Sequence, residues 1–65
     1  MHQNFENSDR MIDQLKAISD QLADQALSVL KEAHLAGESK RPEAERTLTQ
    51  ARRAVEKAIS LLTRG

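Results

Sequence analysis

The sequence predicts an all-α protein, folded as an antiparallel hairpin of two amphipathic helices. Two stretches carry apolar residues at steps of three and four, which is the period of one helix face. Gly37 and Pro42 lie between these stretches, a pattern typical of one helix ending and the next beginning. Good helix formers dominate the rest, and β-branched residues form no alternating run. We expect one domain spanning residues 1–65, with helices at about 8–36 and 42–64 joined by a turn at 37–41.

The first helix is expected to begin with Ser8 as its N-cap and Asp9 in its first turn. Its apolar series comprises Met11, Leu15, Ile18, Leu22, Ala26, Leu30 and Ala33. Ile12, Ala23 and Leu27 widen this stripe on one side. A stripe wider than a simple seam indicates contact with more than one neighbouring helix.

The turn and the second helix have clear local signals. Gly37 suits the position just after a helix, where a positive φ is common. Pro42 suits the first helical position, because its missing N–H would have had no partner there. The apolar series of the second helix comprises Ala44, Leu48, Ala51, Val55, Ala58 and Leu62, in heptad spacing. The connection is so short that the two helices must be antiparallel neighbours.

Folding the chain about residues 39–40 predicts which side chains form the hairpin core. The expected core comprises Leu15, Ile18, Leu22, Ala26, Leu30, Leu48, Ala51, Val55, Ala58 and Leu62. The residues expected to bind a partner are Phe5, Met11, Ile12, Ala23, Leu27 and Ile59. For the first three of these, a frayed helix end is the alternative interpretation.

The net charge is zero, but it is unevenly distributed: residues 1–30 carry −3 and residues 31–65 carry +3. This asymmetry indicates either attraction between the two helices or a basic face for nucleic acid. The basic band consists of Arg46, Arg52, Arg53 and Lys57. Glu45 and Glu56 interrupt it, and no aromatic residues are interleaved for base stacking. We therefore expect solvated or intramolecular charges and no nucleic-acid partner.

The sequence offers little for catalysis or metal binding. His34 and Glu38 lack a third ligand, so we interpret His34 as a polar residue near a helix C-terminus. Asp20 and Asp24 are best explained as a solvated acidic face. There is no Cys, no Gly-rich phosphate loop and no nucleophile–base pair. We expect no enzymatic activity, no metal, no cofactor and no small-molecule substrate.

No membrane segment or secretion signal is expected. No apolar run approaches the ~20 residues of a membrane span. The first residues lack the basic and apolar regions of a signal peptide. We expect a soluble, cytoplasmic protein with no membrane partner.

The stretch ALSVLKEAHLAGESKRPEAERTLTQARRAVEKAISLL, from Ala26 onward, resembles the small co-chaperones of type III secretion needle subunits, the YscE/PscE-like family. The matching residues are Ala26, Leu27, Leu30, Lys31, Gly37, Ala54, Glu56, Ala58 and Ile59. The chain departs from the family pattern at Pro42 in the turn, and it lacks an aromatic–Gln element early in the second helix. The resemblance implies a protein that pairs with a larger helical chaperone and helps to keep a needle subunit unpolymerised.

The functional hypothesis is a non-enzymatic protein–protein interaction module, a small adaptor or co-chaperone for a helical partner. The alternative is a homodimeric four-helix-bundle regulator with RNA as a candidate ligand, similar in architecture only to Rop. We also expect that the isolated chain is not a monomer, because one seam barely stabilises so short a chain. Two hairpins packed along the flank of Ile12, Ala23, Leu27 and Ile59 would form a four-helix bundle with an isologous interface.

Overall fold

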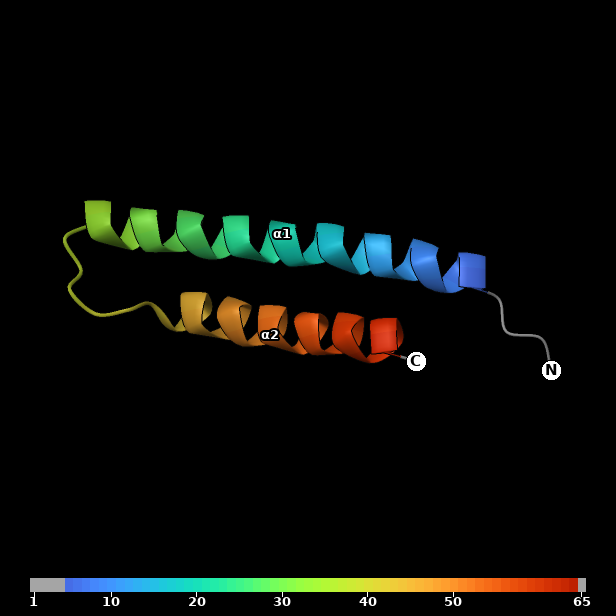
Figure 1. Ribbon diagram of the computed structural model, residues 1–65. Helices are drawn as coiled ribbons and strands as arrows, with labels where there is room; N and C mark the ends of the chain where they lie inside the picture. The colour runs from blue at the N-terminus through green and yellow to red at the C-terminus, as the bar shows by residue number, and fades with distance from the viewer. Residues whose placement is uncertain (1–4, 65) are drawn as a thin grey trace.

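The protein is a hairpin of two antiparallel helices in a computed structural model that describes residues 5–64. Helix α1 spans Phe5–Leu35 and helix α2 spans Glu43–Arg64. The two helices lie side by side, and α1 extends past the end of α2 (Figure 1). Within residues 5–64 there is no strand, and every residue outside 36–42 is helical. The predicted all-α hairpin is therefore confirmed.

Helix α1 begins earlier than its capping signal predicted. Its first residue is Phe5, so Ser8 lies inside the helix. The prediction of Ser8 as an N-cap is wrong, because an N-cap residue has a non-helical backbone. A cap contributes only about 1 kcal/mol, so the hydrogen bonds of one further turn are enough to override it.

The end of α1 is closed by a Schellman motif. Gly37 has a φ of 83°. Its N–H bonds to the His34 carbonyl at 3.0 Å, and the Glu38 N–H bonds to the Ala33 carbonyl at 3.0 Å. These two bonds satisfy carbonyls that have no partner within the helix. The prediction that Gly37 ends the first helix with a positive φ is confirmed.

Helix α2 begins one residue later than predicted. The Pro42 carbonyl accepts a hydrogen bond from the Arg46 N–H at 3.2 Å, and the helix proper starts at Glu43. Pro42 therefore occupies the capping position rather than the first helical one. Glu43 and Glu45 lie in the first turn, where carboxylates are stabilised by the helix dipole.

The two helices meet along one seam. On α1 the buried and half-buried seam residues are Ile12, Leu15, Ser19, Leu22, Ala26, Val29 and Ala33. On α2 the half-buried residues that continue the predicted series are Leu48, Ala51, Val55, Ala58 and Leu62. Both sets alternate steps of three and four, which keeps a stripe facing an antiparallel neighbour. Of the predicted core, the five α2 residues and Leu15 and Leu22 of α1 are half-buried in this seam, and Ala26 is buried.

The remaining part of the predicted α1 core is wrong. Ile18 is 43% exposed and Leu30 is 42% exposed. Successive steps of four move a stripe around the helix, by about 40° per step, so these residues turn away from α2. The prediction that Ile12 binds a partner is not supported by its burial, since Ile12 is only 8% exposed. It belongs to the seam, in phase with Ser19.

We predict that aspartate substitutions at Ile12 and Ile18 will show whether the observed seam or the seam predicted from the sequence stabilises the hairpin. Ile12→Asp places an unpaired carboxylate in the seam and should cost several kcal/mol of unfolding free energy. Ile18→Asp should change it by less than about 1 kcal/mol, because the side chain is already largely in water. Circular dichroism during urea unfolding measures both. Equal losses would contradict the observed seam.

We also predict that Gly37→Ala will destabilise the hairpin through its backbone alone. A Cβ at Gly37 meets no atom within 4 Å, so the cost comes only from the positive φ. That cost is about 1 kcal/mol, equivalent to a fall in Tm of about 4–8 °C. Gly37→Asn is the control and should lose less, because Asn tolerates this backbone region. Unchanged melting of the Ala variant would be inconsistent with the Schellman motif.

Candidate partner-binding groove

A groove runs along one side of the seam, where the flanks of both helices leave space. It consists of two open hollows that share Arg52. The first is lined by Lys16, Ser19, Asp20, Arg52, Glu56 and Ile59. The second is lined by Leu22, Ala23, Ala26, Leu27, Leu30, Glu45, Thr49 and Arg52. Charged and polar residues predominate in the lining toward the free ends of the helices, and apolar residues of α1 predominate toward the turn.

The apolar half is formed by α1. Ala23, Leu27 and Leu30 follow one another at steps of four and three, so they lie on one face beside the seam. Leu27 is 59% exposed and Leu30 is 42% exposed. These two leucines therefore present apolar surface directly beside the α2 side chains that line the same hollow.

Arg52 is held at the centre of the groove by contacts to both helices. Its Nε donates a hydrogen bond to the Ser19 Oγ at 3.4 Å. Its Nη2 lies 3.5 Å from the Glu56 Oε2. Ser19 is only 6% exposed, so this bond gives a buried hydroxyl a partner. Sequence reasoning missed this contact, although Ser19 follows Ile12 by seven residues, the interval of the seam.

Glu45 forms a second polar cluster, at the turn end of the groove. Its carboxylate accepts hydrogen bonds from the Arg41 guanidinium and, at 2.9 Å, from the Thr49 hydroxyl. The side chain of Glu45 is 12% exposed. The hydrogen bond from Arg41, with a smaller contribution from Thr49, lowers the pKa of Glu45 below its ordinary value of 4.5. The same contact raises the pKa of Arg41.

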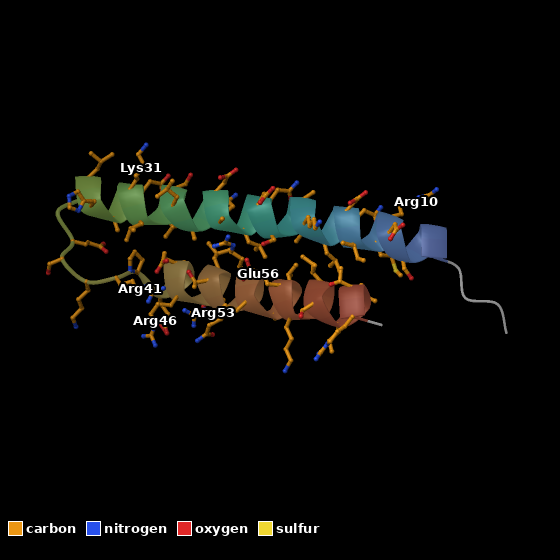
Figure 2. All side chains as sticks on the ribbon, in the orientation of Figure 1. Arg10, Lys31, Arg41, Arg46, Arg53 and Glu56 are labelled. Atoms are coloured by element: carbon orange, nitrogen blue, oxygen red, sulfur yellow. The ribbon has the colours of Figure 1, made fainter. Side chains whose placement is uncertain are left out.

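The basic band that the sequence suggested is divided by the fold. Arg52 turns toward the groove, whereas Arg46 and Arg53 point away from α1 in Figure 2. Glu45 and Glu56 each pair with an arginine on the groove side. The carboxylates therefore lie beside the groove, apart from the outward ridge that carries Arg46 and Arg53.

The structure brings together half of the residues assigned to partner binding. Ala23 and Leu27 line one hollow of the groove, and Ile59 lines the other. Met11 is 45% exposed but precedes Ile12, so it lies on the opposite side of the seam. Ile12 is in the seam itself. Phe5 belongs to α1, but its side chain lies outside the described part of the structure.

The groove offers surface rather than reactive groups. Its two hollows are open and their charged side chains are paired or solvated. Among the described residues, no three His, Asp or Glu side chains gather closely enough to hold a metal ion. Within residues 5–64, neither helix combines the length and the apolarity needed to cross a membrane. His34 lies near the end of α1 beside Leu30 and Leu35, on a separate shallow hollow.

The fold and the groove define the class of the protein as a two-helix hairpin with an unfilled lateral groove. Comparison of the chain with protein-family models, with curated proteins and with solved structures finds no match.

The lowered pKa of Glu45 predicts a pH-dependent contribution to stability. Because the carboxyl is ionised in the folded chain at pH values where the unfolded chain binds a proton, its contribution is present above pH 4.5. It is lost as the pH falls through the lowered pKa. Glu45→Gln should therefore reduce the free energy of unfolding slightly near neutral pH, and this difference should shrink in acid.

Urea unfolding across this pH range, followed by circular dichroism, measures the effect. Glu43→Gln is the matched control, because Glu43 occupies the same first turn and makes no ion pair among the described residues. A Glu45→Gln difference that stays constant or grows in acid would show that the Arg41 contact does not stabilise the hairpin.

Proposed function

We propose that the chain is a non-enzymatic interaction module, an adaptor or co-chaperone whose lateral groove binds helices of another protein chain. The observation that carries the proposal is the position of Ala23, Leu27 and Leu30. They form one apolar face directly beside the seam, opposite the α2 side chains of the groove. A helix packed on this face would bury the leucines that the hairpin itself leaves in water.

The form of the groove suits a helical ligand. Peptide helices bind apolar grooves through anchors spaced at three and four residues, and the groove residues of both α1 and α2 have this spacing. Complete burial of a fully exposed leucine contributes about 1.5–3 kcal/mol, and Leu27 and Leu30, at 59% and 42% exposed, would contribute a part of this each. An extended peptide strand finds no such support, since residues 5–64 contain no sheet edge.

The charged side chains at the groove give such binding its selectivity. Lys16, Asp20, Arg52 and Glu56 surround the polar hollow, so a ligand must present charges in a matching order. Arg52 is already fixed by Ser19 and Glu56. Such preorganisation lowers the entropic cost of using this guanidinium in an interface.

The resemblance to needle co-chaperones is compatible with this site. Of the residues that carry the resemblance, Leu27, Leu30, Glu56 and Ile59 all line the groove. We therefore propose the docking of a larger helical chaperone as one specific form of the function. The proposal of an interaction module stands on the groove and does not depend on that form.

We predict that a charge at Leu27 will weaken association, whereas a charge at Leu61, outside the groove, will not. Leu27→Glu introduces a carboxylate into the apolar half of the groove and should weaken binding to a helical partner at least about tenfold. Leu61→Glu is the control, because Leu61 is similarly exposed, at 51%, and precedes the seam residue Leu62 on the side away from the groove.

Association is measured by light scattering of the purified chain, for self-association, and by affinity capture from the native cell. Circular dichroism confirms that both variants remain helical. The proposal fails if the wild-type chain neither self-associates nor captures a protein, or if the two variants behave alike.

A further inference from the structure

The charges along the groove side of α2, continued into the turn before it, have an order that inverts about Thr49. Along the chain the order is Arg41, which precedes α2 and pairs with Glu45, followed by the groove-lining residues Glu45, Thr49, Arg52 and Glu56. The signs read plus, minus, neutral, plus, minus. The same string read backwards is minus, plus, neutral, minus, plus. A second α2 lying antiparallel to the first, with Thr49 opposite Thr49, would therefore meet an opposite charge at every charged position.

A string of α1 residues that runs along the groove and just past its turn end has the same property about Leu27. Asp20, Ala23, Leu27 and Leu30 line the groove, and His34 lies on the neighbouring hollow that shares Leu30; the five follow at steps of three, four, three and four. Read backwards, the string places His34 opposite Asp20 and Leu30 opposite Ala23. Leu27 meets itself, so the centre is apolar and the ends pair a carboxylate with an imidazole.

The two centres of inversion lie at the same level of the hairpin. Leu27 and Thr49 line the same hollow, although 22 positions separate them in the sequence. Asp20 and Glu56 likewise share the other hollow. One two-fold axis, perpendicular to the helices and passing the groove at this level, therefore relates both strings to their reversed copies at once.

We infer that the groove is the self-complementary interface of a two-fold dimer, and that its occupant is a second copy of this chain. This inference rests on the proposed function, because it names the partner of the same groove. Each α1 lies antiparallel on the partner's α1, centred on Leu27, and each α2 lies antiparallel on the partner's α2, centred on Thr49. In this arrangement Glu45 of each copy lies opposite Arg52 of the other copy, so the pair occurs twice in the dimer.

The alternative two-fold axis, parallel to the helices, is disfavoured by the same charges. It would place each α1 against the partner's α2 at the same level. Glu45 would then face the second copy's Leu30, since these two residues line one hollow in each hairpin. A carboxylate set against an apolar face opposes association, so the perpendicular axis, which sets Glu45 against Arg52, is the arrangement that the groove supports.

The exposed area of the chain is large enough for an interface with a second copy. The hairpin exposes 5480 Å², whereas a compact monomer of 7.3 kDa exposes about 4200 Å². A stable interface buries about 600–1000 Å² from each partner. Covering the groove with a second copy would therefore remove most of the excess.

A mixing experiment tests the axis directly. Glu45→Arg alone places arginine opposite Arg52 twice in each dimer, and Arg52→Glu alone places glutamate opposite Glu45 twice. Each variant by itself should dissociate at least about tenfold more readily than wild type. In an equimolar mixture, a dimer that contains one copy of each variant has opposite charges at both contacts between positions 45 and 52. Dimers should therefore reappear. Sedimentation equilibrium of the full chain measures all three samples.

A matched pair controls for the attraction between oppositely charged chains. Glu43→Arg and Arg53→Glu change the net charge by the same amounts but lie outside the groove linings. Each control variant should dimerise alone as wild type does. Circular dichroism of every variant separates dissociation from unfolding.

A cysteine placed on the axis gives an independent measurement, since the chain has no cysteine. In Thr49→Cys the new thiol meets its symmetry mate and should form a disulfide-linked dimer under mild oxidation. In Thr47→Cys, on the outer face of the same helix, it should not. Slow or equal cross-linking of the two variants overturns the inference, as does a mixture of the charge variants that stays dissociated.

The outcomes also separate this inference from the proposed function. A wild-type chain that is monomeric but captures another helical protein in a Leu27-dependent way overturns the second copy as occupant and leaves the groove as a docking site. A chain that associates with nothing overturns both.

Discussion

The single seam between α1 and α2 is the constraint on which the rest of the structure depends. Two helices share one interface, so each can bury only one stripe of side chains. Among residues 8–64, only Ile12, Ser19 and Ala26 are buried, and every other seam residue is half-buried. The Cα radius of gyration is 15.6 Å, compared with about 11 Å for a compact domain of this length. Side chains flanking the seam therefore stay in water, and the groove is a direct consequence.

Small residues determine how closely the helices approach along that seam. Ser19, Ala26 and Ala33 recur at intervals of seven on α1, and Ala51 and Ala58 recur at the same interval on α2. Between them lie larger residues, so the stripe alternates narrow and wide positions and the two faces can interdigitate. The hydroxyl at Ser19 is tolerated because Arg52 reaches it across the seam. This hydrogen bond fixes the Arg52 guanidinium at the middle of the groove. The packing of the core therefore affects the arrangement of charges on the surface.

The hairpin and its turn could be predicted from sequence because their signals are local. Gly37 supplies the positive φ of the Schellman motif, and Pro42 caps the next helix within one residue of the expected place. The seam of α1 could not be predicted with the same accuracy. Ile18 and Leu30 are more apolar than Ser19, so a search for apolar residues selects a stripe that drifts around the helix. What decides the seam is a strict alternation of steps facing a partner helix, and that depends on α2 rather than on local composition. The groove, too, is only partly predictable from sequence. The sequence identifies Ala23, Leu27 and Ile59 as apolar residues that flank the seam. The contact between Arg52 and Ser19 depends on how the two helices pack.

The ion pairs of α2 and the turn before it contribute little to stability, since water screens pairs of charges at a protein surface. Their greater effect is on position. Arg41 holds Glu45, and Glu56 holds Arg52, so four charges beside the groove are already restricted in conformation before any partner arrives. Ordering a long side chain at an interface costs about 0.5–1.5 kcal/mol, and much of that cost is met here within the monomer. A partner of matching charge order then gains its electrostatic contacts with a smaller loss of entropy, while a partner of the wrong order meets repulsion that cannot easily relax. The pairs therefore act mainly on the selectivity of the groove, and the seam that leaves the groove open supplies the apolar surface that gives binding its affinity.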